Sequence, residues 1–174
     1  HLRRISICEK SDYICKKYGA TVNRSGYRGL WGEATIAGKR VILVKPQTFM
    51  NLSGEAVSEA AKFYKIPAEN ILVFSDDVSL DVGRVRMRGK GSDGGQKGLR
   101  SIITHMSTDG FPRVKFGVGA KPHPDYDLAD WVLSTFSAQE EKALAPAIEK
   151  AADAALCIIE KGLAEASNRY SGKA

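Results

Sequence analysis

The sequence contains few of the residues that commonly form disulfides or bind metals. Only three cysteines occur among its 174 residues, and no two of them are spaced as CxxC: Cys8, Cys15 and Cys157. This indicates neither a disulfide framework nor a cysteine zinc site, so we expect buried or unreactive thiols. The three histidines are scattered and form no HExxH motif: His1, His105 and His123. We therefore predict no metal site.

Long hydrophobic runs are absent as well. No stretch approaches about 18 uncharged apolar residues, so we predict no membrane span, and the apolar residues 5–8 are too few for a signal peptide. The expected location is therefore the cytoplasm. With 43% apolar and 26% charged residues, and neither a repeat nor a flexible linker, the chain is expected to form one domain over residues 1–174.

The charge is unevenly distributed. The net charge is +6, yet the segment from Arg84 to Lys121 contains nine Lys or Arg and two Asp, a balance of +7 that leaves −1 for the rest. A basic stretch on an otherwise balanced domain is typical of a surface that binds a polyanion such as nucleic acid. Taken alone, it is equally consistent with an ordinary solvated face.

The first half of the chain predicts a hairpin. Residues 33–36 and 40–46 flank an Ala-Gly-Lys turn. The run 41–44 is apolar without alternation, which favours the more buried of the two strands.

A helix and a buried strand are expected next. Residues 53–66 have apolar side chains at helical spacing and end before Pro67. A second continuous apolar strand is predicted at 70–75, followed directly by Asp76-Asp77.

Two later strands are expected to carry cations on one face. In residues 82–88 three arginines alternate with apolar side chains, and in residues 111–118 Arg113 and Lys115 do the same. The predicted basic face of the first strand consists of Arg84, Arg86 and Arg88, joined by Arg100 from the helix that follows.

The end of the chain predicts helices. Ser137 and Glu140 form a capping box, and Pro146 is expected in the first turn of a second helix. That helix has one apolar stripe: Leu144, Ile148, Ala152, Leu156, Ile159 and Leu163. Since strands and helices alternate throughout, the fold class is α/β, with helices covering a largely buried sheet.

The glycine-rich segment 89–95 lies between a predicted strand and a helix that runs to about Met106. The segment matches the GxGxxG pattern of dinucleotide-binding proteins, but the next strand does not end in an acidic residue that could bind a ribose, so a dinucleotide site is disfavoured. The GxxxxGK[ST] pattern of phosphate-binding loops is absent. The loop could instead bind phosphate through its backbone N–H groups, with Lys97 and Arg100 nearby. A simple connecting turn remains an open alternative.

Polar or exposed side chains follow two buried strands. Asp76-Asp77 could orient a histidine, hold a metal or serve as ordinary turn acids. Residues 49–51, Phe-Met-Asn, could form an apolar wall with one directed amide, although core packing would explain the Phe and Met equally well.

Four motifs occur in order between about Asp12 and Tyr170. They are KPQTFMNLSG at 45–54, SDD at 75–77, GKGSDGGQKG at 89–98, and FPRVKFGVG at 111–119 followed by Pro-His-Pro. Together they make the chain similar to bacterial-type peptidyl-tRNA hydrolases.

The resemblance implies a monomeric, three-layer α/β/α domain with a mixed central sheet. It also implies hydrolysis of the ester between peptide and tRNA in peptidyl-tRNA, without a metal or cofactor. In that family a histidine is the general base on water, and Asp76 takes the position of the aspartate that orients it. Phe49, Asn51 and Lys97 take positions at the tRNA end, and Met50 and Gln96 line the cleft.

The sequence departs from the family pattern in two places. Gln96 and Lys97 stand where the family has histidine and asparagine in GGHNG. Arg4 stands where the register places the general base, and a guanidinium cannot accept a proton at physiological pH. We therefore expect that residues 1–11 are incomplete or altered relative to the family, and that hydrolysis by this chain is weak or absent.

Two other functions stay open. One is a non-catalytic RNA-binding module of the same fold, against which the presence of Asp76 argues. The other, weaker, is a nucleotide-cofactor enzyme that uses the loop 89–95.

Overall fold

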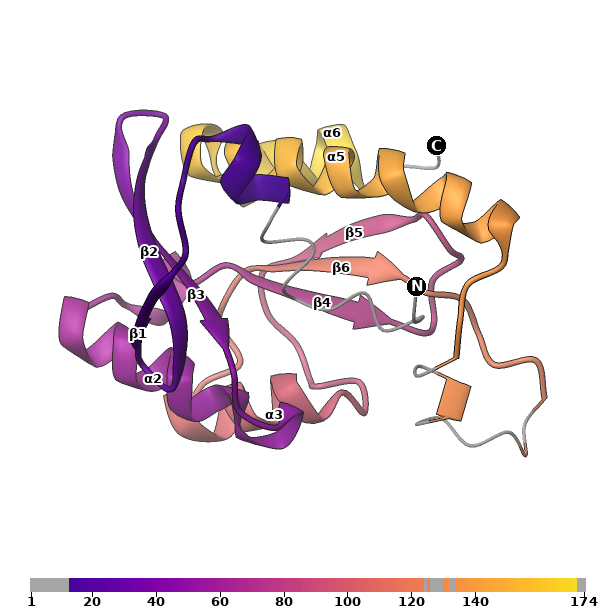
Figure 1. The fold of residues 1–174 in the computed structure, drawn as a ribbon, viewed down its shortest axis with the longest axis horizontal. Coiled ribbons are helices and arrows are strands. Elements are labelled where there is room, and N and C mark those ends of the chain that lie inside the picture. Colours follow the sequence, from indigo (N-terminus) through magenta and orange to yellow (C-terminus); the bar gives the residue numbers. More distant parts are fainter. Residues whose placement is uncertain (1–12, 124, 126–129, 132–133, 172–174) are drawn as a thin grey trace.

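The computed structural model describes residues 13–123, 125, 130–131 and 134–171. The expectations for His1, Arg4 and Cys8, and for an altered segment at 1–11, lie outside these residues. Two three-stranded sheets lie between two helical layers (Figure 1), which confirms the α/β/α architecture and the mixed sheet.

The strands form two groups. The first sheet is antiparallel in the order β1-β2-β3, made of β1 (Arg24–Gly26), β2 (Gly29–Ile36) and β3 (Lys39–Pro46). The second has the order β4-β6-β5, made of β4 (Val73–Asp77), β5 (Val85–Arg88) and β6 (Arg113–Gly117). In it β4 runs parallel and β5 antiparallel to β6.

Helices cover both faces. One layer contains α2 (Ser53–Tyr64), preceded by the 3-10 turn η1 (Met50–Leu52), and α3 (Lys97–Met106). The other contains α5 (Ala138–Lys161) and α6 (Leu163–Tyr170). A second 3-10 turn, η2 (Ala68–Asn70), joins α2 to β4.

The predicted hairpin is confirmed. Ile36 pairs with Lys39, and the two residues between them, Ala37 and Gly38, have φ of 52° and 72°. This is the left-handed, two-residue turn whose twist matches that of paired strands.

The predicted helix at 53–66 and strand at 70–75 are also confirmed, with shifted ends. Helix α2 ends at Tyr64 because Lys65 adopts φ 55°. Strand β4 begins only at Val73, since Ala68–Asn70 forms η2.

The alternation predicted for residues 111–118 is confirmed, but the face with Arg113 and Lys115 is covered and not open to solvent. Strand β6 is the middle strand of its sheet, and helices pack on both faces of that sheet. The side chains on either face of β6 are therefore buried or partly buried. Arg113 is only 1% exposed. Its guanidinium donates hydrogen bonds to the carbonyl oxygens of Ser92 (2.8 Å) and Asp109 (3.0 Å). It also lies 4.4 Å from the ring centre of Phe111. Burial lowers the pKa of Arg113 below its ordinary value.

The capping box is confirmed, but Pro146 does not begin a helix. Ser137 and Glu140 cap α5, which continues through Pro146 to Lys161. A proline inside a helix costs about 3 kcal/mol, and the packing of the α5 face that contains Ala147, Ala151 and Ala154 offsets this cost. Leu163 is not on this helix, because Gly162 (φ 91°) separates α5 from α6.

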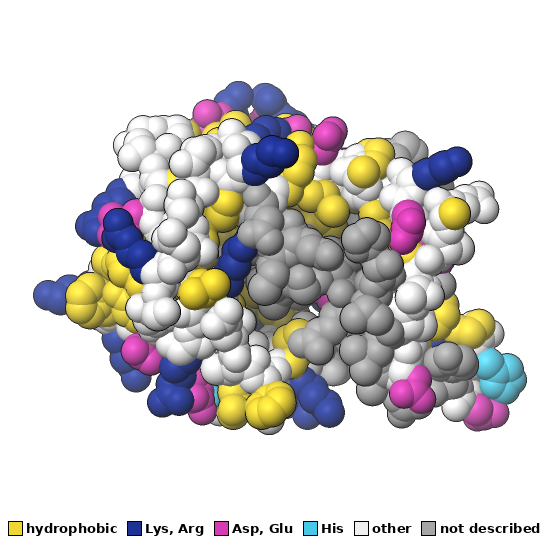
Figure 2. Space-filling model, in the orientation of Figure 1, with side chains coloured by type: hydrophobic (Ala, Val, Ile, Leu, Met, Phe, Trp, Pro, Cys, Tyr) yellow, Lys and Arg dark blue, Asp and Glu magenta, His cyan; other side chains and the backbone are white. Residues whose placement is uncertain are grey.

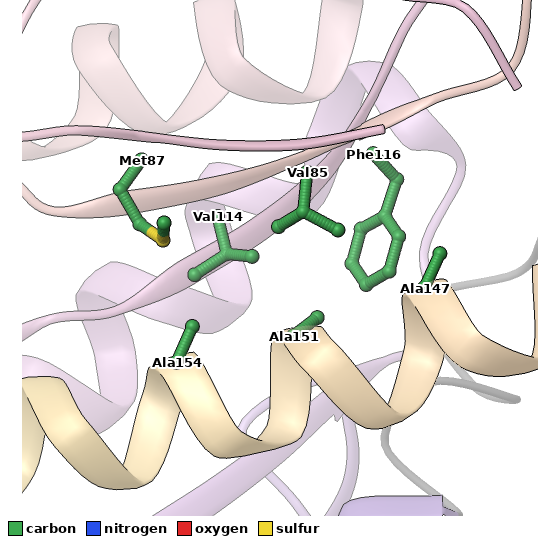
Figure 3. Close-up of a cluster of buried hydrophobic side chains, with 7 residues drawn as sticks. All are labelled: Val85, Met87, Val114, Phe116, Ala147, Ala151 and Ala154. Atoms are coloured by element: carbon green, nitrogen blue, oxygen red, sulfur yellow. The ribbon is translucent and has the colours of Figure 1, made fainter. Parts of the chain in front are cut away.

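The best-packed region lies between α5 and the second sheet (Figure 3). Side chains of β5 and β6 interdigitate with small residues of the helix: Val85, Met87, Val114, Phe116, Ala147, Ala151 and Ala154. All of these are at most 4% exposed. Alanines on α5 let the helix approach the sheet closely.

The region between β3 and β4 is open by comparison. A cavity of about 780 Å³ separates the two sheets, and its lining includes Val41–Val44 of β3, Val73 and Phe74 of β4, and side chains of α2 and α5. Residues 41–44 are only half-buried, so the strand predicted to be the more buried one is not closely packed.

The expectation for two of the cysteines is confirmed, because Cys15 and Cys157 are buried free thiols. None of the helices within the described residues is long and apolar enough to cross a membrane.

Candidate functional site

Two motifs that are far apart in the sequence meet where η1 lies against the start of α3. The side-chain amide of Gln96 lies 3.7 Å from the sulfur of Met50, and Gln96 caps α3 by accepting the N–H of Leu99 at 2.7 Å. A β-carbon on Gly98 would lie 2.6 Å from the Met50 sulfur, so a larger residue there would displace the Met50 side chain from this contact. The structure thus brings the two predicted cleft residues together.

The crossing of α2 and α3 holds this contact in place. The backbone N–H of Gly54 donates to the hydroxyl of Ser101 at 2.9 Å. A β-carbon on Gly54 would lie 2.2 Å from the Ser101 carbonyl oxygen. The glycine in KPQTFMNLSG therefore permits the close approach of the two helices that carry the site.

The three residues predicted at the tRNA end border this contact. Phe49 is 82% exposed, although its side chain is large and apolar, and Asn51 and Lys97 are exposed as well. Phe49 and Asn51 flank Met50 in the chain, and Lys97 follows Gln96. An aromatic ring, an amide and an ammonium group therefore face solvent beside the Met50–Gln96 contact.

A small cavity of about 10 Å³ lies behind this surface. It is lined by residues of η1, α2, β4 and α3: Met50, Ser53, Val73, Phe74, Ser75, Gln96, Gly98, Leu99 and Ile102. The hydroxyl oxygen of Ser75 is buried without a hydrogen-bond partner. The cavity has room for about one water molecule.

The two acids at the end of β4 point to opposite faces, because side chains alternate along a strand. Asp77 lies on the face of Lys115, whose ammonium is 3.0 Å from its carboxylate. Asp76 pairs with Phe116 in the register and lies on the other face, where Phe74 and Phe116 contribute to the packed core. The structure therefore gives the two acids different surroundings.

Asp77 has a structural role that the sequence did not reveal. It accepts hydrogen bonds from the N–H (2.8 Å) and hydroxyl (2.5 Å) of Ser79 as well as from Lys115. Burial opposes the ionised form, but the bonds from Ser79 and Lys115 outweigh it and lower the pKa of Asp77. Lys115 is therefore used to hold the end of β4.

Interactions within the protein fix the glycine-rich loop. The carboxylate of Asp93 pairs with Arg100 at 3.1 Å and accepts a hydrogen bond from the N–H of Gly95 at 2.6 Å, and both interactions lower the pKa of Asp93. The guanidinium of Arg113 donates a hydrogen bond to the carbonyl oxygen of Ser92 in the same loop. A phosphate at this loop would have to compete with the Asp93 carboxylate for Arg100.

The remaining members of the predicted basic face differ in availability. Arg88 is exposed, Arg86 is partly buried, and Arg84 lies 3.6 Å from Asp81. These cations do not form one continuous basic stripe. Arg113 and Lys115 point inward, and Arg84 and Arg100 pair with acids.

His105 and His123, the histidines among the described residues, each contact a nearby residue. The Nδ1 atom of His105 lies 2.8 Å from the carbonyl oxygen of Ser101 within α3, and His123, 68% exposed, lies 3.4 Å from Asp125. Within the described ranges no three His, Cys, Asp or Glu side chains gather in a metal-binding cluster.

Comparisons with known proteins agree with the sequence motifs. The family model described as Peptidyl-tRNA hydrolase matches residues 8–174. Similar relatives include the peptidyl-tRNA hydrolases of Clostridium botulinum (strain Kyoto / Type A2), 46% identical, and of Clostridium novyi (strain NT), 48% identical. Each alignment covers 161 residues, 92% of this chain and 84% or 85% of the relative.

Solved structures show the same similarity. A peptidyl-tRNA hydrolase in complex with N-propanol superposes with a TM-score of 0.89 at 28% identity. The enzyme from Acinetobacter baumannii superposes with a TM-score of 0.88 at 29% identity. Both cover 95% of this chain and 84% of the other chain.

Proposed function

The chain belongs to the peptidyl-tRNA hydrolase family, and from this membership we propose that it hydrolyses the ester between peptide and tRNA in peptidyl-tRNA, releasing free tRNA. The observation that carries the proposal is the contact between Met50 and Gln96, which joins two of the segments that resemble the family. We further propose that residues 1–174 act as one domain, as a monomer, in the cytoplasm.

The chemistry requires a base. Water attacks the ester carbonyl carbon as it loses a proton, the bond to the ribose oxygen breaks, and that oxygen takes up a proton. Asp76, at the end of β4, is the residue we assign to orient the base. A carboxylate that accepts one imidazole N–H keeps the other ring nitrogen free to accept a proton.

The exposed side chains around η1 and α3 suit the RNA end of the substrate. Phe49 offers a face on which a base can stack, Asn51 an amide, and Lys97 a cation for a phosphate. Met50 and Gln96 form the wall between them. Arg84, Arg86, Arg88 and Arg100 would add longer-range attraction for the polyanion.

We also propose that turnover by this chain is low. Arg4 stands where the resemblance places the catalytic histidine, and loss of a general base typically reduces the rate about 10²- to 10⁴-fold.

The test is hydrolysis of an N-acyl-aminoacyl-tRNA by the 174-residue protein and its variants. We expect slow release of free tRNA, a higher rate for Arg4→His, and a rate at least about 10²-fold lower for Asp76→Asn in the Arg4→His background. Asp153→Asn, a partly exposed acid on α5 that pairs with Lys17, is the matched control and should leave the rate unchanged. Equal rates for Asp76→Asn and its parent would contradict the role of Asp76.

A second candidate is RNA binding without turnover, favoured because Arg4 stands where the resemblance places the catalytic histidine. Tight binding of tRNA with no hydrolysis, even by Arg4→His, would support this candidate over the hydrolase.

A further inference from the structure

A group of aromatic side chains lies on the surface at the opposite end of α2 from η1. Two come from the β1–β2 hairpin and two from the last turn of α2: Tyr27, Trp31, Phe63 and Tyr64. Five pairs of ring centres among them are 4.9 to 6.2 Å apart, and Phe63 is 70% exposed. We call these four residues the aromatic patch. Figure 2 shows it as yellow atoms at the left edge, with dark blue cations beside them.

Two arginines lie against the aromatic rings. The guanidinium of Arg24 is 5.1 Å from the ring centre of Trp31, and that of Arg40 is 5.3 Å from Tyr64. A hydrogen bond with Tyr27 raises the pKa of Tyr64 to about 12, so the phenol stays neutral. The patch therefore presents flat rings with cations at their sides.

The uncompensated charge around the patch is positive. Glu33 pairs with Arg40, whereas Glu55 and Glu59 share the single cation of Arg28. Arg24, Lys62 and Lys65 form no ion pair with any described residue. These five cations and three acids leave a balance of +2, so the surface favours an anionic partner.

The hairpin tip that carries Tyr27 is strained. Gly26 pairs with Gly29, and the two residues between them, Tyr27 and Arg28, have φ of 50° and 53°. Such a turn favours Asn-Gly, because larger side chains are disfavoured in the left-handed region. Strain of this kind is common where a side chain is needed for function.

We propose that the aromatic patch binds unpaired nucleotides of RNA, with bases stacked on Phe63 and Tyr27 and phosphates neutralised by Arg24, Lys62 and Lys65. Stacking on aromatic rings beside cations is the general way in which proteins hold single strands. Helix α2 is 12 residues long, so the patch lies about 18 Å from η1. About five stacked nucleotides span that distance. The choice of RNA over an acidic protein rests on the proposed function, in which the substrate is an RNA.

The test is binding of a fluorescein-labelled single-stranded RNA octamer to the full chain, measured by anisotropy at several salt concentrations. Phe63→Ala should weaken binding about 5- to 150-fold. Arg24→Gln and Lys62→Gln should each reduce the slope of log affinity against log salt by about 0.7. Lys142→Gln, an exposed cation on α5, is the charge-matched control and should change neither quantity.

Three results would overturn the proposal. One is unchanged affinity in Phe63→Ala, and the second is a salt slope in Arg24→Gln and Lys62→Gln equal to that of Lys142→Gln. The third is binding of fluorescein-labelled poly-glutamate, but not of the labelled octamer, that is lost in Phe63→Ala, which would indicate an acidic protein partner. The octamer carries no ester, so failure to hydrolyse N-acyl-aminoacyl-tRNA would contradict the proposed function and leave this binding result standing.

Discussion

The two sheets of this molecule are built from similar apolar strands, yet they are packed very differently. On β6, Val114 and Phe116 are at most 1% exposed and lie against the alanines of α5. On β3, residues 41–44 are half-buried beside a cavity of about 780 Å³. A continuous apolar run thus predicts that a strand packs against another layer, but the neighbouring elements determine how closely that layer packs.

The largest expected effect tests this comparison with two phenylalanines whose rings are 6.3 Å apart. Phe116→Ala should lower the free energy of unfolding by about 3–5 kcal/mol, because it removes a fully buried ring from a close-packed site. Phe74 packs at the edge of the same cluster, where it borders the cavity, and is only partly buried. Phe74→Ala should therefore cost less than half as much, because less apolar surface of that ring leaves water on folding. Urea denaturation of both variants measures the difference, and equal losses would mean that the edge of the cluster beside the cavity is as closely packed as its centre.

An intermediate effect concerns the ion pair that joins β4 to β6. Asp77→Asn should lower the free energy of unfolding by about 1–2 kcal/mol at pH 7, since it weakens charge-assisted hydrogen bonds in a largely buried site. The pKa of Asp77 is below its ordinary value of 3.8. Its contribution is therefore present above that pH and is lost as the pH falls through the lowered pKa.

Denaturation of the wild type and Asp77→Asn from pH 7 to pH 2 measures this dependence. The two curves should converge on the acid side, whereas Asp81→Asn, an exposed acid, should follow the wild type throughout. A difference that grows as the pH falls would contradict the assigned sign.

The smallest effect is expected at the cavity itself. Val44→Ala on β3 should cost under about 1 kcal/mol, because the half-buried side chain loses few contacts. Val114→Ala, the same change on β6, should cost about 2 kcal/mol. Thermal unfolding of the pair provides the measurement, and a larger loss for Val44→Ala would show that β3 is covered more tightly than β6.

Much of the fold could be predicted from local patterns. The β2–β3 hairpin, α2, β4, α3 and the capping box at Ser137 all lie close to the predicted positions, because turn residues, helical spacing and caps act within a few residues. The continuation of α5 through Pro146 could not be predicted, because packing against a distant sheet offsets the local cost of the proline.

The candidate site was predictable only in part. The motifs indicate Met50, Gln96 and Asp76, but not that Met50 contacts Gln96 or that Asp76 and Asp77 have different surroundings. Asp93 was also missed as the partner of Arg100, since nothing in the spacing of the two residues shows that the loop brings them together.

The sequence by itself determined the α/β class, most of the helices and strands, and the resemblance to peptidyl-tRNA hydrolases, since these depend on local periodicity and on residue types at close spacing. Only the tertiary structure decided which charges face solvent. Arg113 and Lys115 have the alternation of a surface strand, but β6 lies in the middle of a covered sheet, so the two cations bind carbonyl groups and Asp77 inside the protein. The pairing order of strands depends on contacts between distant segments, which a local pattern does not contain.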